Sequence, residues 1–359
     1  MTTPYISAVR LGGSSALPLL VLGPALGTSA RALWSRCAVH LTDRFEVLAW
    51  DLPGHGSNTE VAEPFSIADL AAGVRSLVDD VLTARGEPGG SFTYAGDSVG
   101  GAVGLQLLLD VPLRVDRAVL VCTGAIIGTP QSWAERAAMV RASGTETTIE
   151  RATHTWFSPG FLHLEPAVAA ELLQALRDAD DEGYAQVCGA LARFDVRDRL
   201  DRIRNPVVAV AGSLDESTPV AGLREIADSV RTGELVVLDD VAHLAVAEAP
   251  QQIAQIIRSD SESMTGQDET QKLPRQRDSR SGEDEHTRSI VDLTARAVLL
   301  EAGSQQEFAA EVRTACRTGL TRAQIERVLD RAAVHSSTMA MHLAATVSRR
   351  VLDDEDDHI

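Results

Sequence analysis

The chain has few cysteines and no closely spaced cysteine pair. Its four cysteines, Cys37, Cys122, Cys188 and Cys316, are scattered over 359 residues. The sequence therefore contains no CxxC metal or redox motif, and scattered cysteines in a chain this long are typical of a reducing compartment. We expect no disulfide scaffold, no metal site and no organic cofactor.

The chain is also poor in positive charge and in long apolar runs. Its 33 Lys and Arg residues face 51 Asp and Glu residues, so the net charge is −18. Phosphate backbones would repel such a protein, and nucleic-acid binding is not expected. No apolar run reaches about 18 residues, and the start, MTTPYISAVR, lacks the pattern of a signal peptide. The sequence predicts a cytoplasmic protein without a membrane partner.

Short apolar runs that end at turn residues recur through residues 1–258. They lie at 19–22, 45–50, 92–95, 118–122, 207–210 and 235–238. Longer helical patterns separate them. This alternation predicts an α/β fold with a mostly parallel sheet that is covered on both faces.

The segment 125–200 interrupts this alternation, because it has helical patterns and no convincing strand. It holds an unusual share of the aromatic side chains, namely Trp133, Trp156, Phe157, Phe161, Tyr184 and Phe194. A helical insertion of this kind predicts a lid that lines a pocket. The alternative is that these aromatics only form the lid's own core.

Composition changes again near the end of the α/β region. Residues 259–284 are polar and charged, which predicts a flexible linker. Helical patterns fill 285–352, and an acidic tail occupies 353–359. Three short helices bury little apolar surface by themselves. We therefore expect this small all-α module to dock or self-associate, and a homo-oligomer through these helices is one hypothesis.

The segment Gly96–Gly100 matches the pattern G-x-S-x-G. It follows an apolar strand and precedes a helical run at 102–109, the context of a nucleophile elbow. In such a turn the Ser98 hydroxyl is exposed at the start of a helix, which favours developing negative charge. The alternative is an ordinary glycine-rich turn.

A serine nucleophile needs a base and an acid that orients the base. In this architecture the acid follows the serine in the chain and the histidine comes last. Asp215 and His243 fit this order, since each follows a late strand. Asp239 and Asp240 are second choices for the acid. The other histidines considered, His55, His154, His163, His335 and His342, are weaker candidates.

The oxyanion of an acyl-transfer reaction needs two backbone N–H donors. Val99, directly after the nucleophile, is one expected donor. The second donor should come from the loop 23–28, which follows the early strand, and Pro24 in this loop has no N–H. We expect Leu26 to be the second donor, with Ala25 as the alternative.

With these residues in place, the first 255 or so residues resemble the α/β-hydrolase superfamily, and within it the 3-oxoadipate enol-lactonases of aromatic-acid catabolism. The matching segments are 26–29, 51–56, 96–101, 156–161, Asp215 with 218–219, and His243 with 248–250. The resemblance implies that the substrate is a small lactone, opened to 3-oxoadipate in the β-ketoadipate pathway by the serine, histidine and aspartate named above. A broader carboxylesterase with the same triad is the alternative.

The substrate of that family carries a carboxylate, so the resemblance also implies an arginine in the lid or at its rim. Arg136, Arg141 and Arg151 are the candidates. We expect Trp133, Trp156 and Arg136 to contact the substrate.

The residues after 284 resemble the C-terminal part of 4-carboxymuconolactone decarboxylases, in the segments 287–291, 313–325 and 332–334. The polar linker stands where that family's N-terminal portion should be, and Glu311 occupies the position of a usual histidine. One hypothesis is an inert interaction module. The other is a bifunctional enzyme that also decarboxylates 4-carboxymuconolactone.

Overall fold

The computed structural model describes residues 3–60, 63–259 and 312–313. The chain divides into two compact units, Met1–Asp268 and Glu269–Ile359. The predicted linker (beyond Ser259), helical module and acidic tail, and the oligomer hypothesis that depends on them, lie outside the described residues apart from 312–313. No helix in the described part is long and apolar enough to cross a membrane.

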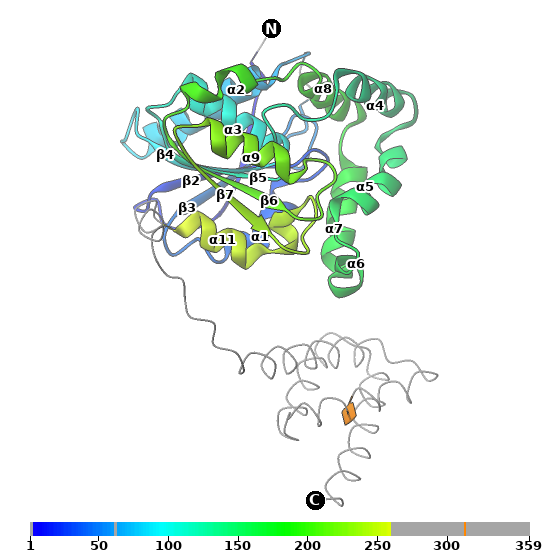
Figure 1. Cartoon of the computed structure of the whole chain (residues 1–359). Helices are drawn as coiled ribbons and strands as arrows, with labels where there is room; N and C mark the ends of the chain where they lie inside the picture. Colours follow the sequence, from blue (N-terminus) through cyan, green and yellow to red (C-terminus); the bar gives the residue numbers. More distant parts are fainter. Residues whose placement is uncertain (1–2, 61–62, 260–311, 314–359) are drawn as a thin grey trace, which may run out of the picture. The chain divides into compact units, whose positions relative to one another are not determined.

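A seven-stranded sheet forms the centre of the first unit (Figure 1). Its strands are β1 (Ser7–Gly12), β2 (Leu19–Gly23), β3 (Glu46–Asp51), β4 (Phe92–Asp97), β5 (Val115–Val121), β6 (Pro206–Gly212) and β7 (Thr232–Leu238). Their order is β1-β3-β2-β4-β5-β6-β7. Only β1 pairs antiparallel in this sheet, with β3, so the predicted mostly parallel sheet is confirmed.

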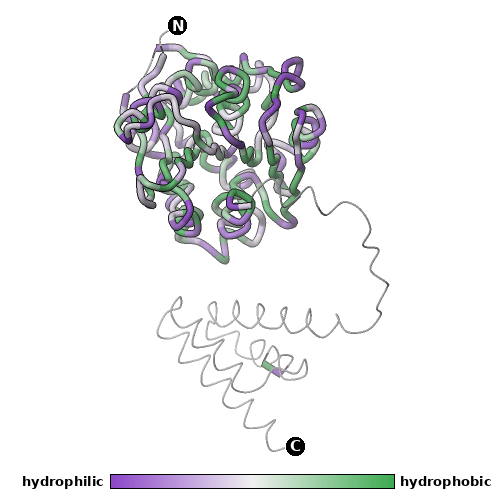
Figure 2. The backbone as a smooth tube through the Cα atoms, turned by 90° about the vertical axis from the view of Figure 1, so that its left-hand side faces the viewer, coloured by the Kyte–Doolittle hydropathy of each residue, from purple (hydrophilic) through white to green (hydrophobic). Residues whose placement is uncertain are grey.

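Helices cover both faces of the sheet (Figure 1). One face carries α1 (Ala30–Ala38) and α11 (Pro250–Arg258), which follows the short helix α10 (Ala245–Glu248). The other carries α2 (Ile67–Ala84), α3 (Val99–Asp110) and α9 (Val220–Ser229). The inner strands are mostly apolar and mostly buried because helices pack on both of their sides. In Figure 2, hydrophobic stretches run through the interior of this unit and hydrophilic stretches lie at its outer turns.

The chain between β5 and β6 forms a layer of helices beside the sheet, which we call the lid (Figure 1). Its helices are α4 (Pro130–Ser143), α5 (Ile149–Trp156), α6 (Phe161–Leu164), α7 (Pro166–Asp178) and α8 (Asp181–Leu191), with 3-10 turns at Thr145–Thr148 and Arg197–Arg202. Thr129 starts α4 with a capping box to Ser132, and Gly144 ends it with φ 80°. All six lid aromatics are buried.

Candidate active site

Ser98 lies at the sharp turn between β4 and α3. Its backbone is in the left-handed region with φ 52°, which is uncommon for a residue with a side chain. The turn is possible because its two flanking glycines touch. A Cβ on Gly96 would lie 2.4 Å from the carbonyl carbon of Gly100. The local sequence therefore builds the expected elbow and holds the hydroxyl at the start of a helix.

The structure brings Ser98, His243 and Asp215 together in a chain of hydrogen bonds. His243 Nε2 lies 3.0 Å from Ser98 Oγ, and His243 Nδ1 lies 2.8 Å from Asp215 Oδ2. The serine follows β4, the aspartate follows β6 and the histidine follows β7. Parallel strands end at one edge of the sheet, so residues far apart in sequence meet there.

Asp215 is held by its own loop as well as by the histidine. Its Oδ1 accepts hydrogen bonds from the N–H of Ser217 at 2.8 Å and of Thr218 at 3.0 Å. Its Oδ2 accepts one from Thr218 Oγ1 at 2.6 Å. These contacts fix the carboxylate behind His243. Asp239 and Asp240, the second choices for the acid, are both exposed.

The pKa values of Asp215 and His243 shift in opposite directions. Burial alone would raise the pKa of Asp215, but the charge and hydrogen bond of His243 and the hydrogen bonds of Thr218 hold it below its usual value. Burial alone would lower the pKa of His243, yet the charge and hydrogen bond of Asp215 raise it above its usual value. The pair is therefore arranged to stabilise a protonated imidazole.

Asp97 adjoins the nucleophile in sequence, but its pKa shifts in the opposite direction from that of Asp215. It is fully buried, and burial raises its pKa well above the usual value despite the nearby His243. A carboxyl group that favours its protonated form is a poor partner for an imidazolium. Asp215 is therefore the acid that faces the histidine.

No other histidine of the described residues lines the cavity at Ser98 or forms a hydrogen bond with its hydroxyl. His154 and His163 are exposed on the lid. His55 is buried, its Nδ1 lies 2.9 Å from the Pro53 carbonyl oxygen, and its ring stacks on Tyr184 with centroids 6.1 Å apart. His335 and His342 lie outside the described residues.

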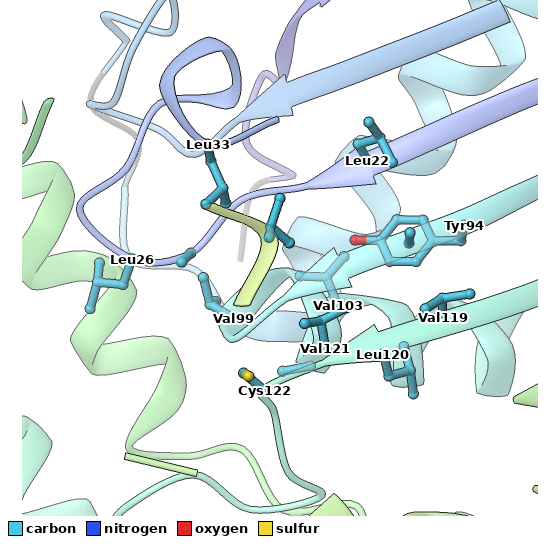
Figure 3. Close-up of a cluster of buried hydrophobic side chains, with 14 of the residues drawn as sticks. Leu22, Leu26, Leu33, Tyr94, Val99, Val103, Val119, Leu120, Val121 and Cys122 are labelled. Carbon is cyan, nitrogen blue, oxygen red and sulfur yellow. The ribbon is translucent and has the colours of Figure 1, made fainter. Parts of the chain in front are cut away.

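The two expected oxyanion donors come from neighbouring segments. The loop after β2 is fastened to the start of α3, because the Gly100 N–H donates to the Pro24 carbonyl oxygen at 2.9 Å. Figure 3 shows Leu26 on that loop and Val99 at the start of α3. Within the described residues, neither the Leu26 nor the Val99 N–H donates to a protein acceptor, so both remain available to a ligand oxygen.

A cavity of about 250 Å³ opens above Ser98 and His243. Its further lining residues are Leu26, Ile127, Gly128, Ser132, Trp133, Arg136, Thr148, Arg151, Ala152, Thr155, Trp156, Tyr184, Glu216 and Ser217. The three side chains expected to contact substrate are among them. The cavity is small beside the roughly 300–1,000 Å³ of common ligand pockets, so it suits a small molecule.

Sequence reasoning left three arginines as candidates, and the structure separates them. Arg136 and Arg151 line the cavity. Arg141 instead forms an ion pair with Glu182 on the exposed surface, with Nε 2.7 Å from Oε2. Tyr184, one of the aromatics of the predicted lid, also lines the cavity, from α8.

The two cavity arginines lie close to one another. The Arg136 guanidinium stacks over the Trp133 ring, 4.6 Å from its centroid. Its charge, together with burial, lowers the pKa of Arg151. Neither arginine forms an ion pair with any carboxylate of the described residues, and Glu216 is the one acidic side chain that they share the cavity lining with. The described residues hold no cluster of three or more His, Cys, Asp or Glu side chains suited to a metal ion.

Comparisons with known proteins show the family of this chain. The model of the alpha/beta hydrolase family matches residues 20–256. Over 239 residues the chain is 32% identical to 3-oxoadipate enol-lactonase 2 of Acinetobacter baylyi, covering 67% of this chain and 86% of that protein. 3-Oxoadipate enol-lactonase 1 of the same organism is 29% identical, covering 69% and 90%.

Solved structures give the same result. The enol-lactonase from Burkholderia xenovorans superposes with a TM-score of 0.66 at 28% identity, covering 70% of this chain and 94% of that one. A hydrolase from Pseudomonas aeruginosa superposes with a TM-score of 0.64 at 30% identity, covering 70% and 91%. The resemblance of residues after 284 to decarboxylases stays a prediction. With its sheet, its elbow and these relatives, the chain belongs to the alpha/beta hydrolase family.

Proposed function

We propose that this protein is a carboxylic ester hydrolase that opens 3-oxoadipate enol-lactone to 3-oxoadipate. The observation that carries the proposal is the hydrogen-bonded chain from Asp215 through His243 to Ser98, placed in a small cavity with two arginines. The enol-lactonases of Acinetobacter baylyi, at 32% and 29% identity, support the choice of lactone.

Ring opening begins with attack of Ser98 Oγ on the lactone carbonyl carbon, while His243 Nε2 takes the hydroxyl proton. The charge that develops on the carbonyl oxygen is stabilised by the N–H groups of Leu26 and Val99. The ring C–O bond then breaks and the ring oxygen leaves as an enolate. His243 returns its proton to this product, which stays attached to the enzyme through the new ester bond.

Water completes the reaction at the same carbonyl carbon. His243 takes a proton from the water, and the ester bond to Ser98 breaks as the serine recovers its proton. Throughout both steps Asp215 stabilises the imidazolium. A route in which His243 activates water directly, without a covalent intermediate, uses the same residues and is the alternative within this proposal.

The substrate carboxylate is bound by Arg136, with Arg151 beside it. Two neighbouring guanidinium groups without an acidic partner form a local basic site in a protein whose net charge is −18. Trp133 holds the Arg136 guanidinium from one side, and Trp156 forms another wall of the cavity.

An ultraviolet assay for loss of the enol-lactone tests the proposal, with the parent protein beside a Ser98→Ala variant. We expect rapid loss with the parent and only background loss with the variant. Loss with neither protein would overturn the enol-lactonase proposal. Faster turnover of simple chromogenic esters than of the lactone would favour the broader carboxylesterase.

A further inference from the structure

The loop that carries His243 is tied to the lid on both sides of the histidine. After it, the Leu244 N–H donates to the Trp156 carbonyl oxygen at 3.0 Å. Before it, the Ala242 N–H donates to Glu248 Oε1 at 3.2 Å. The same carboxylate oxygen accepts the N–H of Ser158 at 3.0 Å.

Glu248 thus adds a second link between two backbone segments that the Leu244–Trp156 hydrogen bond joins directly. Ser158 follows the end of α5, and Ala242 directly precedes the base of the proposed mechanism. The side chain is half-buried, and burial raises its pKa above the usual value despite its hydrogen bonds. Removing an acceptor that serves two backbone N–H groups destabilises this contact, because both donors lose that partner at once.

We propose that Glu248 is a positioning residue that couples the end of lid helix α5 to His243, and so fixes the distance between the cavity wall at Trp156 and the catalytic imidazole. The inference rests on the proposed hydrolase function for the role of His243. Glu248 lies outside the lining of the Ser98 cavity, and in this proposal it controls the position of the lid relative to His243.

Glu248 reaches the histidine loop by accepting a hydrogen bond from the Ala242 N–H. The charges that shift the pKa of His243 most belong to Asp215, Asp97 and Arg136. A glutamine at position 248 keeps an Oε1 acceptor for both N–H groups, whereas an alanine removes it. Misplacement of a catalytic group by about 1 Å costs roughly 100-fold in rate.

The experiment measures two properties of Glu248→Ala and Glu248→Gln in the full chain. One is the rate at which a fluorophosphonate probe labels Ser98, which reports activation of the serine for any substrate. The other is kcat and KM for the enol-lactone. Glu165→Ala is the matched control, because Glu165 ties the lid to α1 through an ion pair with Arg36 at 3.0 Å and forms no hydrogen bond with the histidine loop. Circular dichroism checks the fold of each variant.

We expect Glu248→Ala to slow labelling and kcat by roughly 10–100-fold and to raise KM, since Trp156 forms part of the cavity. Glu248→Gln should recover most of both rates, with the pH profile of the parent, and Glu165→Ala should label at the parental rate. Labelling of a folded Glu248→Ala variant at the parental rate would overturn the inference. So would a Gln variant as slow as the Ala variant.

The same data separate this inference from the proposed function. If the parent is labelled but does not hydrolyse the lactone, the choice of substrate fails. Slow labelling of Glu248→Ala would still support the role of Glu248 in that case.

Discussion

Among the charged side chains near His243, Asp215 has the largest effect on how strongly the proposed base holds its proton. Asp215 raises the pKa of His243 above the usual value of about 6.5, and the base must be neutral to accept the Ser98 proton. Activity should therefore be lost as pH falls through a midpoint above that value. Asp215→Asn should move this midpoint to lower pH and reduce kcat by roughly 10⁴-fold.

A pH profile of kcat/KM for both proteins checks this, because that ratio reports the ionisation of the free enzyme. Thr218 keeps its hydroxyl beside position 215 in the variant, so the loop should stay folded. An unchanged midpoint in Asp215→Asn would contradict the electrostatic role assigned to the aspartate.

Replacing Arg136 should weaken the binding of substrates that carry a carboxylate and should leave the binding of neutral substrates nearly unchanged. A hydrogen bond to a charged group contributes about 1.5–3 kcal/mol, so Arg136→Gln should lower kcat/KM for the enol-lactone by roughly 10–100-fold. Hydrolysis of a neutral acetate ester should change little. Arg141→Gln is the control, because Arg141 pairs with Glu182 outside the cavity. Equal losses on the acetate and the lactone would argue against a carboxylate site.

The residues of the triad were accessible to sequence reasoning because each is tied to a short local pattern. The glycines of the elbow mark Ser98, and the turns after two late apolar runs mark Asp215 and His243. The sequence alone could not show which of Arg136, Arg141 and Arg151 line the cavity. That depends on which faces of α4 and α5 turn inward, and which of the lid aromatics line the cavity likewise depends on how the lid helices pack, as α8 does beside α4.

At the scale of secondary structure elements, the close approach of β2 and α3 holds the oxyanion loop in place. A Cβ on Gly100 would lie 2.6 Å from the Gly23 carbonyl carbon. Gly100→Ala should therefore push α3 away from the loop, cost about 1–3 kcal/mol of stability and reduce activity. Thermal unfolding and the lactone assay measure both effects.

Gly189→Ala in α8 is the matched control for this substitution. Its Cβ would meet only the end of the Arg193 side chain at 3.7 Å, and alanine favours a helix over glycine by about 0.5–1 kcal/mol. A Gly100→Ala variant as stable and as active as this control would contradict the packing argument.

The six apolar runs correctly predicted six of the seven strands, because buried parallel strands are apolar on both faces. β1 was missed for the opposite reason. It lies at the sheet edge, pairs only with β3, and its residues SAVRLG are mostly half-buried. A short edge strand with an arginine at Arg10 gives no apolar run to detect.

At the scale of the whole molecule, every residue named in the site belongs to the first compact unit, Met1–Asp268. A fragment that ends at Asp268 should therefore keep the lactone kcat/KM of the full chain. Side-by-side kinetics of fragment and parent measure this. A folded fragment without activity would mean that residues 269–359 contribute to the site.

The lid is an insertion between two neighbouring strands, and it leaves their pairing in the sheet intact. β5 and β6 are direct neighbours, with Val119 opposite Val208, although five helices separate them in sequence. The entropy cost of closing such a loop grows only with the logarithm of its length. Descendants of this chain can therefore lengthen, shorten or exchange the lid while they inherit the serine, histidine and aspartate unchanged. Selection can alter the choice of substrate separately from the capacity to hydrolyse it.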